Sequence, residues 1–87
     1  MDLSSVLDRL HKYGQKATYS AVGGIVGSPA RSVMHGQPKS HRNTWVVAKK
    51  DRQPTGYTSA ERDPRLQPAA NPLASPEELL TWLKAYP

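Results

Sequence analysis

The sequence contains no cysteine. This absence excludes a disulfide framework, a cysteine-ligated zinc or iron–sulfur site, and a thiolate nucleophile. A long hydrophobic run is also missing, because the most apolar stretch, residues 21–27, holds three glycines and falls short of the about 20 residues that cross a bilayer. No basic segment followed by an apolar one opens the chain, so we expect no secretory signal and predict a soluble, cytoplasmic protein.

The length of 87 residues suits one small domain and leaves no room for a separate cofactor-binding domain. Lys and Arg outnumber Asp and Glu by 12 to 7, and the resulting net charge of +5 favours an anionic partner. The excess is concentrated in residues 31–60, where six basic residues stand against a single acid. These residues are Arg31, Lys39, Arg42, Lys49, Lys50 and Arg52, against Asp51.

Two segments carry the strongest helix signals. Apolar residues recur at i, i+3, i+4 and i+7 from Leu3, which predicts an amphipathic helix over residues 3–13 that stops at Gly14. Near the other end, the motif SPEE at residues 75–78 forms a capping box with proline at the first helical position. This motif predicts a closing helix over residues 76–85 that packs back on the core.

Between these two segments the sequence favours a helix-turn-helix. Thr18 can cap a short second helix that Gly27 ends. The pair Gly23 and Gly24 inside that helix indicates that a neighbouring segment approaches its backbone closely. Residues 28–35 begin with a fresh serine cap followed by proline, and they predict a third helix after a single glycine turn.

A small hairpin is expected after the third helix. Residues 44–47 have strand composition, and residues 54–57 provide a returning strand after a polar turn. The predicted fold class is therefore mainly α with a small β-hairpin, a winged helix-turn-helix plus a C-terminal helix. Residues 63–75 are rich in proline and lack periodicity, so they form an extended connector. We expect one domain made of a winged core (1–62), the connector (63–75) and the C-terminal helix (76–87).

The basic segment coincides with the predicted third helix, the loop after it and the hairpin tip. A winged helix would place these parts against DNA phosphates, so we predict double-stranded DNA as the partner of a monomeric protein. The candidate DNA-binding residues are Tyr19, Ser28, Arg31, Ser32, His35, Lys39, His41, Arg42, Lys49 and Lys50. The alternative is a protein-interaction module whose basic face docks an acidic partner, with Trp45 or Trp82 as an anchor.

Patterns for catalysis or metal binding are weak. His35 and His41 have few carboxylates near them in the sequence, so we expect no metal site. Ser40 and His41 are adjacent, and no acid shortly before them could orient the imidazole ring. We therefore expect no catalytic residue, no metal and no cofactor.

Several short motifs together resemble one known family. The segment TYSAV at residues 18–22 and the segment VGSPARSV at residues 26–33 resemble the DNA-binding domain of alkylguanine–DNA alkyltransferases and of their cysteine-less alkyltransferase-like relatives. That family has a tyrosine that opens a short helix, a Gly-(Ser/Asn)-Pro turn and an Ala-Arg-Ala-Val recognition helix. The segments at residues 45–47, 56–59 and 79–83 are similar to its later strand, loop and closing helix.

The resemblance implies a role in DNA repair. Tyr19 would press on the phosphate of an extruded nucleotide, and Arg31 would enter the base stack through the minor groove. Alignment on the paired valines, Val46 and Val47, puts residues 42–45 at the position of the family's Pro-Cys-His-Arg motif. Alignment on His41 and Arg42 matches the His-Arg of that motif but misplaces the valines. Neither alignment supplies a cysteine, so alkyl transfer to this protein is excluded. Recognition of a damaged base and simple binding of a duplex both stay open.

Overall fold

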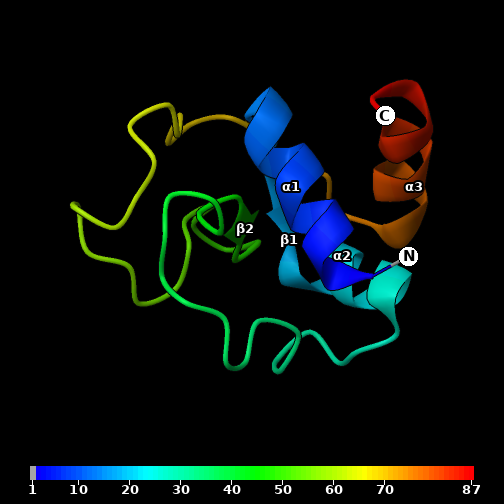
Figure 1. The fold of residues 1–87 in the computed structure, drawn as a ribbon, viewed down its shortest axis with the longest axis horizontal. Helices are drawn as coiled ribbons and strands as arrows, with labels where there is room; N and C mark the ends of the chain where they lie inside the picture. The colour runs from blue at the N-terminus through cyan, green and yellow to red at the C-terminus, as the bar shows by residue number, and fades with distance from the viewer. Residues whose placement is uncertain (1) are drawn as a thin grey trace.

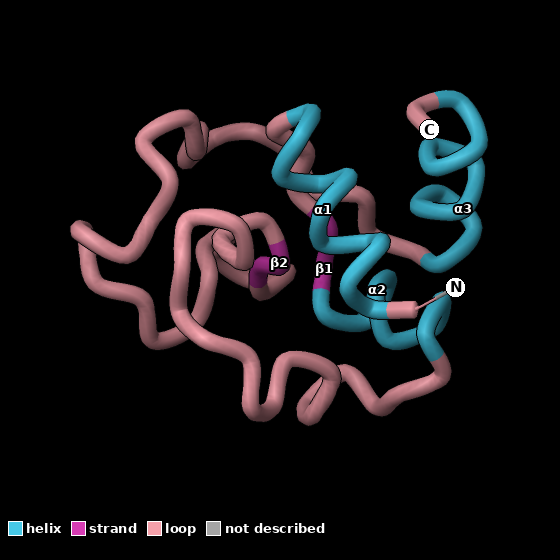
Figure 2. Tube along the Cα trace, viewed as in Figure 1, coloured by secondary structure: helices cyan, strands magenta, loops and turns pink. Residues whose placement is uncertain are grey.

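The computed structural model describes residues 2–87. Within that range the elements follow the order α1 (Leu3–Tyr13), β1 (Ala17–Thr18), α2 (Tyr19–Val26), β2 (Val46–Val47) and α3 (Pro76–Ala85). Figure 1 shows α3 on one side of the molecule's centre and β2 with its long loops on the other, and Figure 2 shows how much of the chain is loop. The prediction of a mainly helical chain is confirmed.

The first two helices form where their local signals place them. Leu7 and Leu10 are buried on one face of α1, which ends at Gly14 in the left-handed conformation with a φ of 65°. The hydroxyl of Thr18 accepts a hydrogen bond from the N–H of Ala21 at 3.1 Å and so caps α2. The helices predicted from apolar spacing and capping residues are therefore confirmed.

The C-terminal helix, α3, packs mainly against α2. The side chain of Ser75 caps its first turn by accepting a backbone hydrogen bond at 3.2 Å, as the SPEE motif predicts. A Cβ at Gly24 would overlap the ring of Pro76, and a Cβ at Gly23 would overlap the carbonyl oxygen of Ser28. The glycine pair therefore permits two close approaches to α2, which confirms the prediction made for it.

The predicted helix over residues 28–35 is wrong. Residues 30–36 form successive turns, in which the N–H of Ser32 donates to the carbonyl of Pro29 and the N–H of His35 donates to the carbonyl of Ser32. The hydroxyl of Ser32 also contacts the Pro29 carbonyl oxygen at 3.4 Å and competes for it. A helix this short would form few backbone hydrogen bonds between residues i and i−4. These bonds do not offset the entropy cost of starting an α-helix.

The predicted antiparallel hairpin is also wrong. The strand β2 pairs in parallel with β1, in a register that sets Val46 opposite Ala17, and residues 54–57 form no strand. Pro54, buried at the start of that segment, has no N–H to offer a ladder. Both residues of β2 are buried, as is typical of a parallel strand. The observed fold is mainly helical with a small parallel sheet, and the winged helix-turn-helix is not confirmed.

The connector over residues 63–75 is irregular but is tied to the core. The buried ammonium group of Lys16 donates to the carbonyl oxygens of Arg52 at 2.8 Å, Pro68 at 3.3 Å and Ala70 at 3.4 Å. Burial lowers the pKa of Lys16 from its ordinary value, and the charge of Arg52 acts in the same direction. This one side chain thus holds the turn after β2 against the connector.

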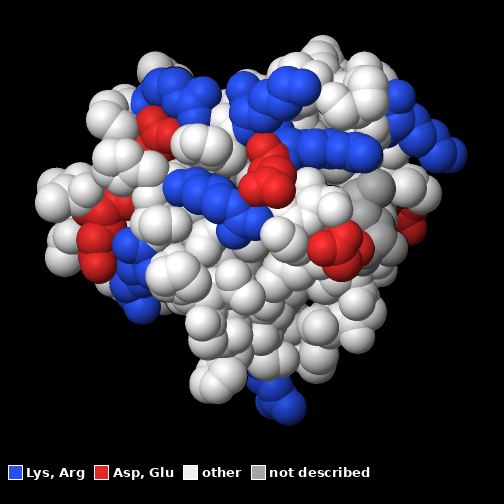
Figure 3. Space-filling view, in the orientation of Figure 1, with Lys and Arg blue, Asp and Glu red and all other residues white. Residues whose placement is uncertain are grey.

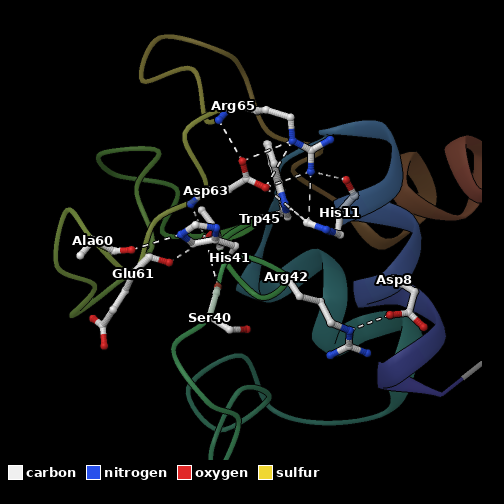
Figure 4. Close-up of polar contacts among 11 residues, drawn as sticks. Asp8, His11, Ser40, His41, Arg42, Trp45, Ala60, Glu61, Asp63 and Arg65 are labelled. Carbon is white, nitrogen blue, oxygen red and sulfur yellow. Dashed lines mark hydrogen bonds and ion pairs between the residues drawn. The ribbon is translucent and has the colours of Figure 1, made fainter.

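A second tie joins the connector to α1 (Figure 4). Arg65 forms an ion pair with the buried Asp63 at 2.9 Å and donates to the carbonyl oxygen of His11 at 2.7 Å. The indole N–H of the buried Trp45 donates to Nδ1 of His11 at 3.3 Å. The N–H of Asp63 donates to the hydroxyl of Thr44 at 3.0 Å, next to that tryptophan. The network therefore links three segments that are distant in the sequence.

The Asp63 carboxylate is expected to make stability depend on acid pH. Hydrogen bonds from Arg65 hold the pKa of Asp63 below its ordinary value and outweigh the effect of burial. Because the folded pKa lies below the unfolded value of about 3.9, the stabilisation is present above that pH and is lost as the pH falls through the folded pKa. Asp63→Asn should therefore lower the free energy of unfolding at neutral pH and flatten its decline in acid.

Urea unfolding at neutral pH and at several acid values checks this expectation. The matched control is Asp51→Asn, which changes an exposed aspartate in the turn after β2. The control should reproduce the acid decline of the wild-type protein. An equal decline in Asp63→Asn and the wild-type protein would contradict the assigned role of this carboxylate.

Candidate nucleic-acid interface

A cavity of about 400 Å³ lies between α2, the turns that follow it and the loop after β2. Its volume falls within the range of about 300–1,000 Å³ that is usual for small-molecule sites. Its lining consists of Tyr19, Ala30, Arg31, Met34, His35, Gln37, Lys39, Asn43, Val46, Thr55 and Tyr57. Four of the predicted DNA-binding residues are brought together here, namely Tyr19, Arg31, His35 and Lys39.

Two tyrosines provide aromatic surface and hydroxyl donors. The half-buried Tyr19 begins α2, and its hydroxyl oxygen accepts a hydrogen bond from the N–H of Thr55 at 3.1 Å. Because that oxygen already accepts, the hydroxyl hydrogen of Tyr19 can be donated to a ligand. Burial raises the pKa of Tyr57 above its ordinary value, and Tyr19 acts in the same direction, so Tyr57 stays protonated at neutral pH.

The rim of the cavity is basic. Arg31, His35 and Lys39 are exposed on the turns and the loop after α2. The side chain of Lys39 lies against the backbone of Gly56: a Cβ added at Gly56 would be 3.3 Å from Cε of Lys39. None of the described residues that line the cavity is acidic. The site therefore offers hydrogen-bond donors and positive charge, which suits a ligand rich in anionic or carbonyl acceptors.

Asn43 is a buried member of the lining that the sequence does not single out. Its Nδ2 donates to the carbonyl oxygen of Pro38 at 2.9 Å, and its Oδ1 accepts from Nη1 of Arg42 at 3.0 Å. These two bonds fix the orientation of the amide. The alignment on the paired valines places Asn43 where the resembled family has cysteine, and this was the one signal that could have indicated it.

Two of the predicted DNA-binding residues are engaged in contacts within the protein (Figure 4). Nε of Arg42 donates to the Asp8 carboxylate at 2.6 Å, and Nη2 donates to the hydroxyl of Ser4 at 2.8 Å. Nε2 of His41 lies 3.1 Å from the carbonyl oxygen of Ala60. The structure therefore places both side chains in contacts that join the loop to other segments, outside the cavity.

The remaining predicted residues also lie outside the cavity lining. Ser28 is half-buried beside Gly23, and Ser32 is exposed on the turns. Lys49 and Lys50 are exposed in the turn after β2. On the face drawn in Figure 3, most Lys and Arg side chains lie over the upper half with Asp and Glu side chains among them, and most of the lower half is uncharged. The basic segment is thus divided between the cavity rim and separate surface positions.

The described residues, 2–87, contain neither a candidate metal site nor a membrane-spanning helix. No group of three or more His, Asp or Glu side chains in this range is placed so that it could hold a metal ion. Every helix in the same range is too short or too polar to cross a membrane.

Comparison with known proteins gives no relative of this chain: no family model, no curated protein and no solved structure matches it. The resemblance to alkyltransferases therefore rests on short motifs, above all the segments at residues 18–22 and 26–33. The cavity beside α2 is lined by residues from both of these segments and from the loop after β2.

Proposed function

We propose that this chain is a non-catalytic protein that binds double-stranded DNA and accepts one extruded nucleotide in the cavity beside α2. One observation carries the proposal: Tyr19 and Arg31, to which the alkyltransferase resemblance assigns roles in extrusion, lie on the wall of one cavity. The resemblance rests on sequence motifs alone, so the presence of Tyr19 and Arg31 on one cavity of suitable size supports these roles. By the same resemblance, the protein would act in DNA repair.

The chemistry of the lining suits a nucleotide. The rings of Tyr19 and Tyr57, together with Met34, offer surfaces on which a base can stack. The hydroxyl of Tyr19 can donate to a phosphate, and Lys39 adds positive charge at the rim. The planar guanidinium of Arg31 can fill the space that an extruded base leaves in the stack.

The helix-turn-helix enters this proposal in a modified form. We propose that α2 and the turns at residues 30–36 together act as the DNA-reading unit, with turns in place of the second helix. The buried Val33 anchors these turns to the core, whereas Arg31 and His35 are exposed. This arrangement leaves the exposed side chains available to a duplex.

A DNA titration tests the proposal. Fluorescence anisotropy should follow the binding of the full chain to three short duplexes: one matched, one mismatched and one with an alkylated guanine. Between about 50 and 200 mM salt, a plot of log affinity against log salt concentration should fall with a slope of about −0.9 for each phosphate that the protein neutralises. Failure to form any complex at low salt would overturn the proposal and favour the alternative, a basic face that docks an acidic protein.

Lys39→Ala is expected to weaken binding to every duplex by a similar factor. Lys39 lies at the rim of the cavity, where a lysine contacts phosphates and reads no base. Loss of one phosphate contact should reduce the magnitude of the salt slope by about 1. Lys84→Ala, which removes an exposed lysine on α3, is the matched control and should leave the slope unchanged. Equal salt slopes for Lys39→Ala and Lys84→Ala would show that the DNA does not contact the rim of the cavity.

A further inference from the structure

A second hollow, of about 530 Å³, follows the outer face of α3. Most of its lining comes from two adjacent rows of that helix, in which residues recur every four positions. The lining residues are Leu73, Glu77, Glu78, Thr81, Trp82, Ala85 and Tyr86. We call this hollow the α3 groove. It shares no lining residue with the cavity beside α2.

One end of the α3 groove is aromatic. The rings of Trp82 and Tyr86 are stacked, with centroids 5.1 Å apart and an interplanar angle of 20°. Tyr13 packs edge-on against both rings, and its hydroxyl donates to the carbonyl oxygen of Pro87 at 2.9 Å. Tyr86 is nevertheless 44% exposed and Tyr13 40% exposed. The rings therefore form an ordered platform that stays accessible from solvent.

The other end of the α3 groove is acidic. Glu77 and Glu78 are exposed in the first turn of α3 and line the groove, and no described lining residue is basic. Glu78 accepts a hydrogen bond from the hydroxyl of Ser75 at 3.3 Å, whereas none of the ion pairs within residues 2–87 involves Glu77. Two exposed carboxylates therefore line the same groove as the ring platform, although the net charge of the chain is +5.

We propose that the α3 groove binds an arginine side chain in a basic segment of a partner protein. A guanidinium is planar and cationic, so it can stack on an indole or phenol ring and donate to carboxylates at the same time. DNA is a poor occupant because the carboxylates of Glu77 and Glu78 repel phosphates. The groove and the DNA cavity are separate, so this inference goes beyond the proposed function and allows DNA and a partner to bind together.

Titration of the full chain with short peptides tests this inference. The probe is a Gly/Ser peptide with one central arginine, compared with the same peptide carrying citrulline, which keeps the shape of arginine and removes its charge. The arginine peptide should shift the indole N–H resonance of Trp82 and leave that of the buried Trp45 unchanged. The citrulline peptide should bind about fivefold more weakly, since it loses both the cation–π contact and the attraction to the carboxylates.

Variants of the chain locate the binding. Glu77→Gln keeps the shape of the side chain, and Tyr86→Ala removes the exposed ring, so each should weaken the arginine peptide about threefold or more. Glu61→Gln removes a carboxylate outside the groove and should have no effect. Equal affinity for arginine and citrulline, or equal loss in Glu61→Gln and Glu77→Gln, would overturn the inference. A change in the Trp82 indole N–H resonance that grows with protein concentration in the absence of peptide would also overturn the inference, because it would show that a second copy of the chain occupies the groove.

Discussion

Arg31→Ala is expected to remove most of the preference for a mismatched or alkylated duplex over a matched one. If Arg31 fills the space that an extruded base leaves in the stack, its contribution to the binding affinity is larger for a base that is easily extruded. Extrusion costs a few kcal/mol, and less at a damaged or mismatched pair. We therefore expect a wild-type preference of about tenfold or more, which corresponds to about 1.4 kcal/mol, and a preference close to one in the variant. Anisotropy titrations with the three duplexes measure both values.

Arg31→Lys is the control that separates stacking from charge. Lysine keeps the positive charge of Arg31 but lacks the planar guanidinium, so the preference should stay low while overall affinity recovers. If Arg31 contacts phosphates alone, alanine would weaken all duplexes equally and lysine would restore them equally. That pattern would contradict extrusion and leave a protein that binds duplex DNA without inserting into it.

Gly23→Ala is expected to destabilise the protein, although alanine is the better helix former. A methyl group at Gly23 would overlap the carbonyl oxygen of Ser28, which is backbone and cannot rotate away. Overpacking costs about 1–3 kcal/mol, and here the strain should exceed the about 1 kcal/mol that alanine gains over glycine in a helix. A net loss of about 1–2 kcal/mol should lower the melting temperature by about 5–15 °C in a domain of this size.

Calorimetry of Gly23→Ala beside Ser20→Ala makes the comparison direct. Ser20 lies in the same helix and is exposed, so its replacement by alanine should change the melting temperature by no more than a few degrees. A melting temperature for Gly23→Ala at or above that of Ser20→Ala would contradict the close approach of Ser28 to α2.

Local signals account for the helices that the sequence predicts correctly. The apolar stripe of α1, the Thr18 cap of α2 and the Ser75 cap of α3 each lie within a few residues of the structure that they specify. The glycine pair in α2 also indicated a close approach, although the residues that approach, Ser28 and Pro76, follow from tertiary packing. Capping and periodicity are properties of neighbouring residues, so they can be read without the fold.

The wrong prediction of a hairpin arises because a distant strand competes with the local one. Strand composition at Val46 and Val47 is correct, but the partner strand is β1, nearly thirty positions earlier, and the local return over residues 54–57 does not form. This parallel pairing also sets Asn43 and Tyr57 beside Tyr19 in the cavity. Those neighbours depend on long-range pairing, so the sequence could suggest Tyr19, Arg31, His35 and Lys39 as site residues but could not show that Asn43 and Tyr57 join them in one cavity.

The most direct test of the central claim is an NMR titration of the ¹⁵N-labelled chain with a short duplex that carries one alkylated guanine. Extrusion into the cavity predicts that the largest shifts fall on its lining, including Tyr19, Asn43 and Tyr57, and that the matched duplex shifts these residues less. Because Asn43 is buried, a surface complex would not shift it strongly. Shifts confined to exposed positions such as Lys49 and Lys50, equal for both duplexes, would contradict the proposal that the cavity holds a nucleotide.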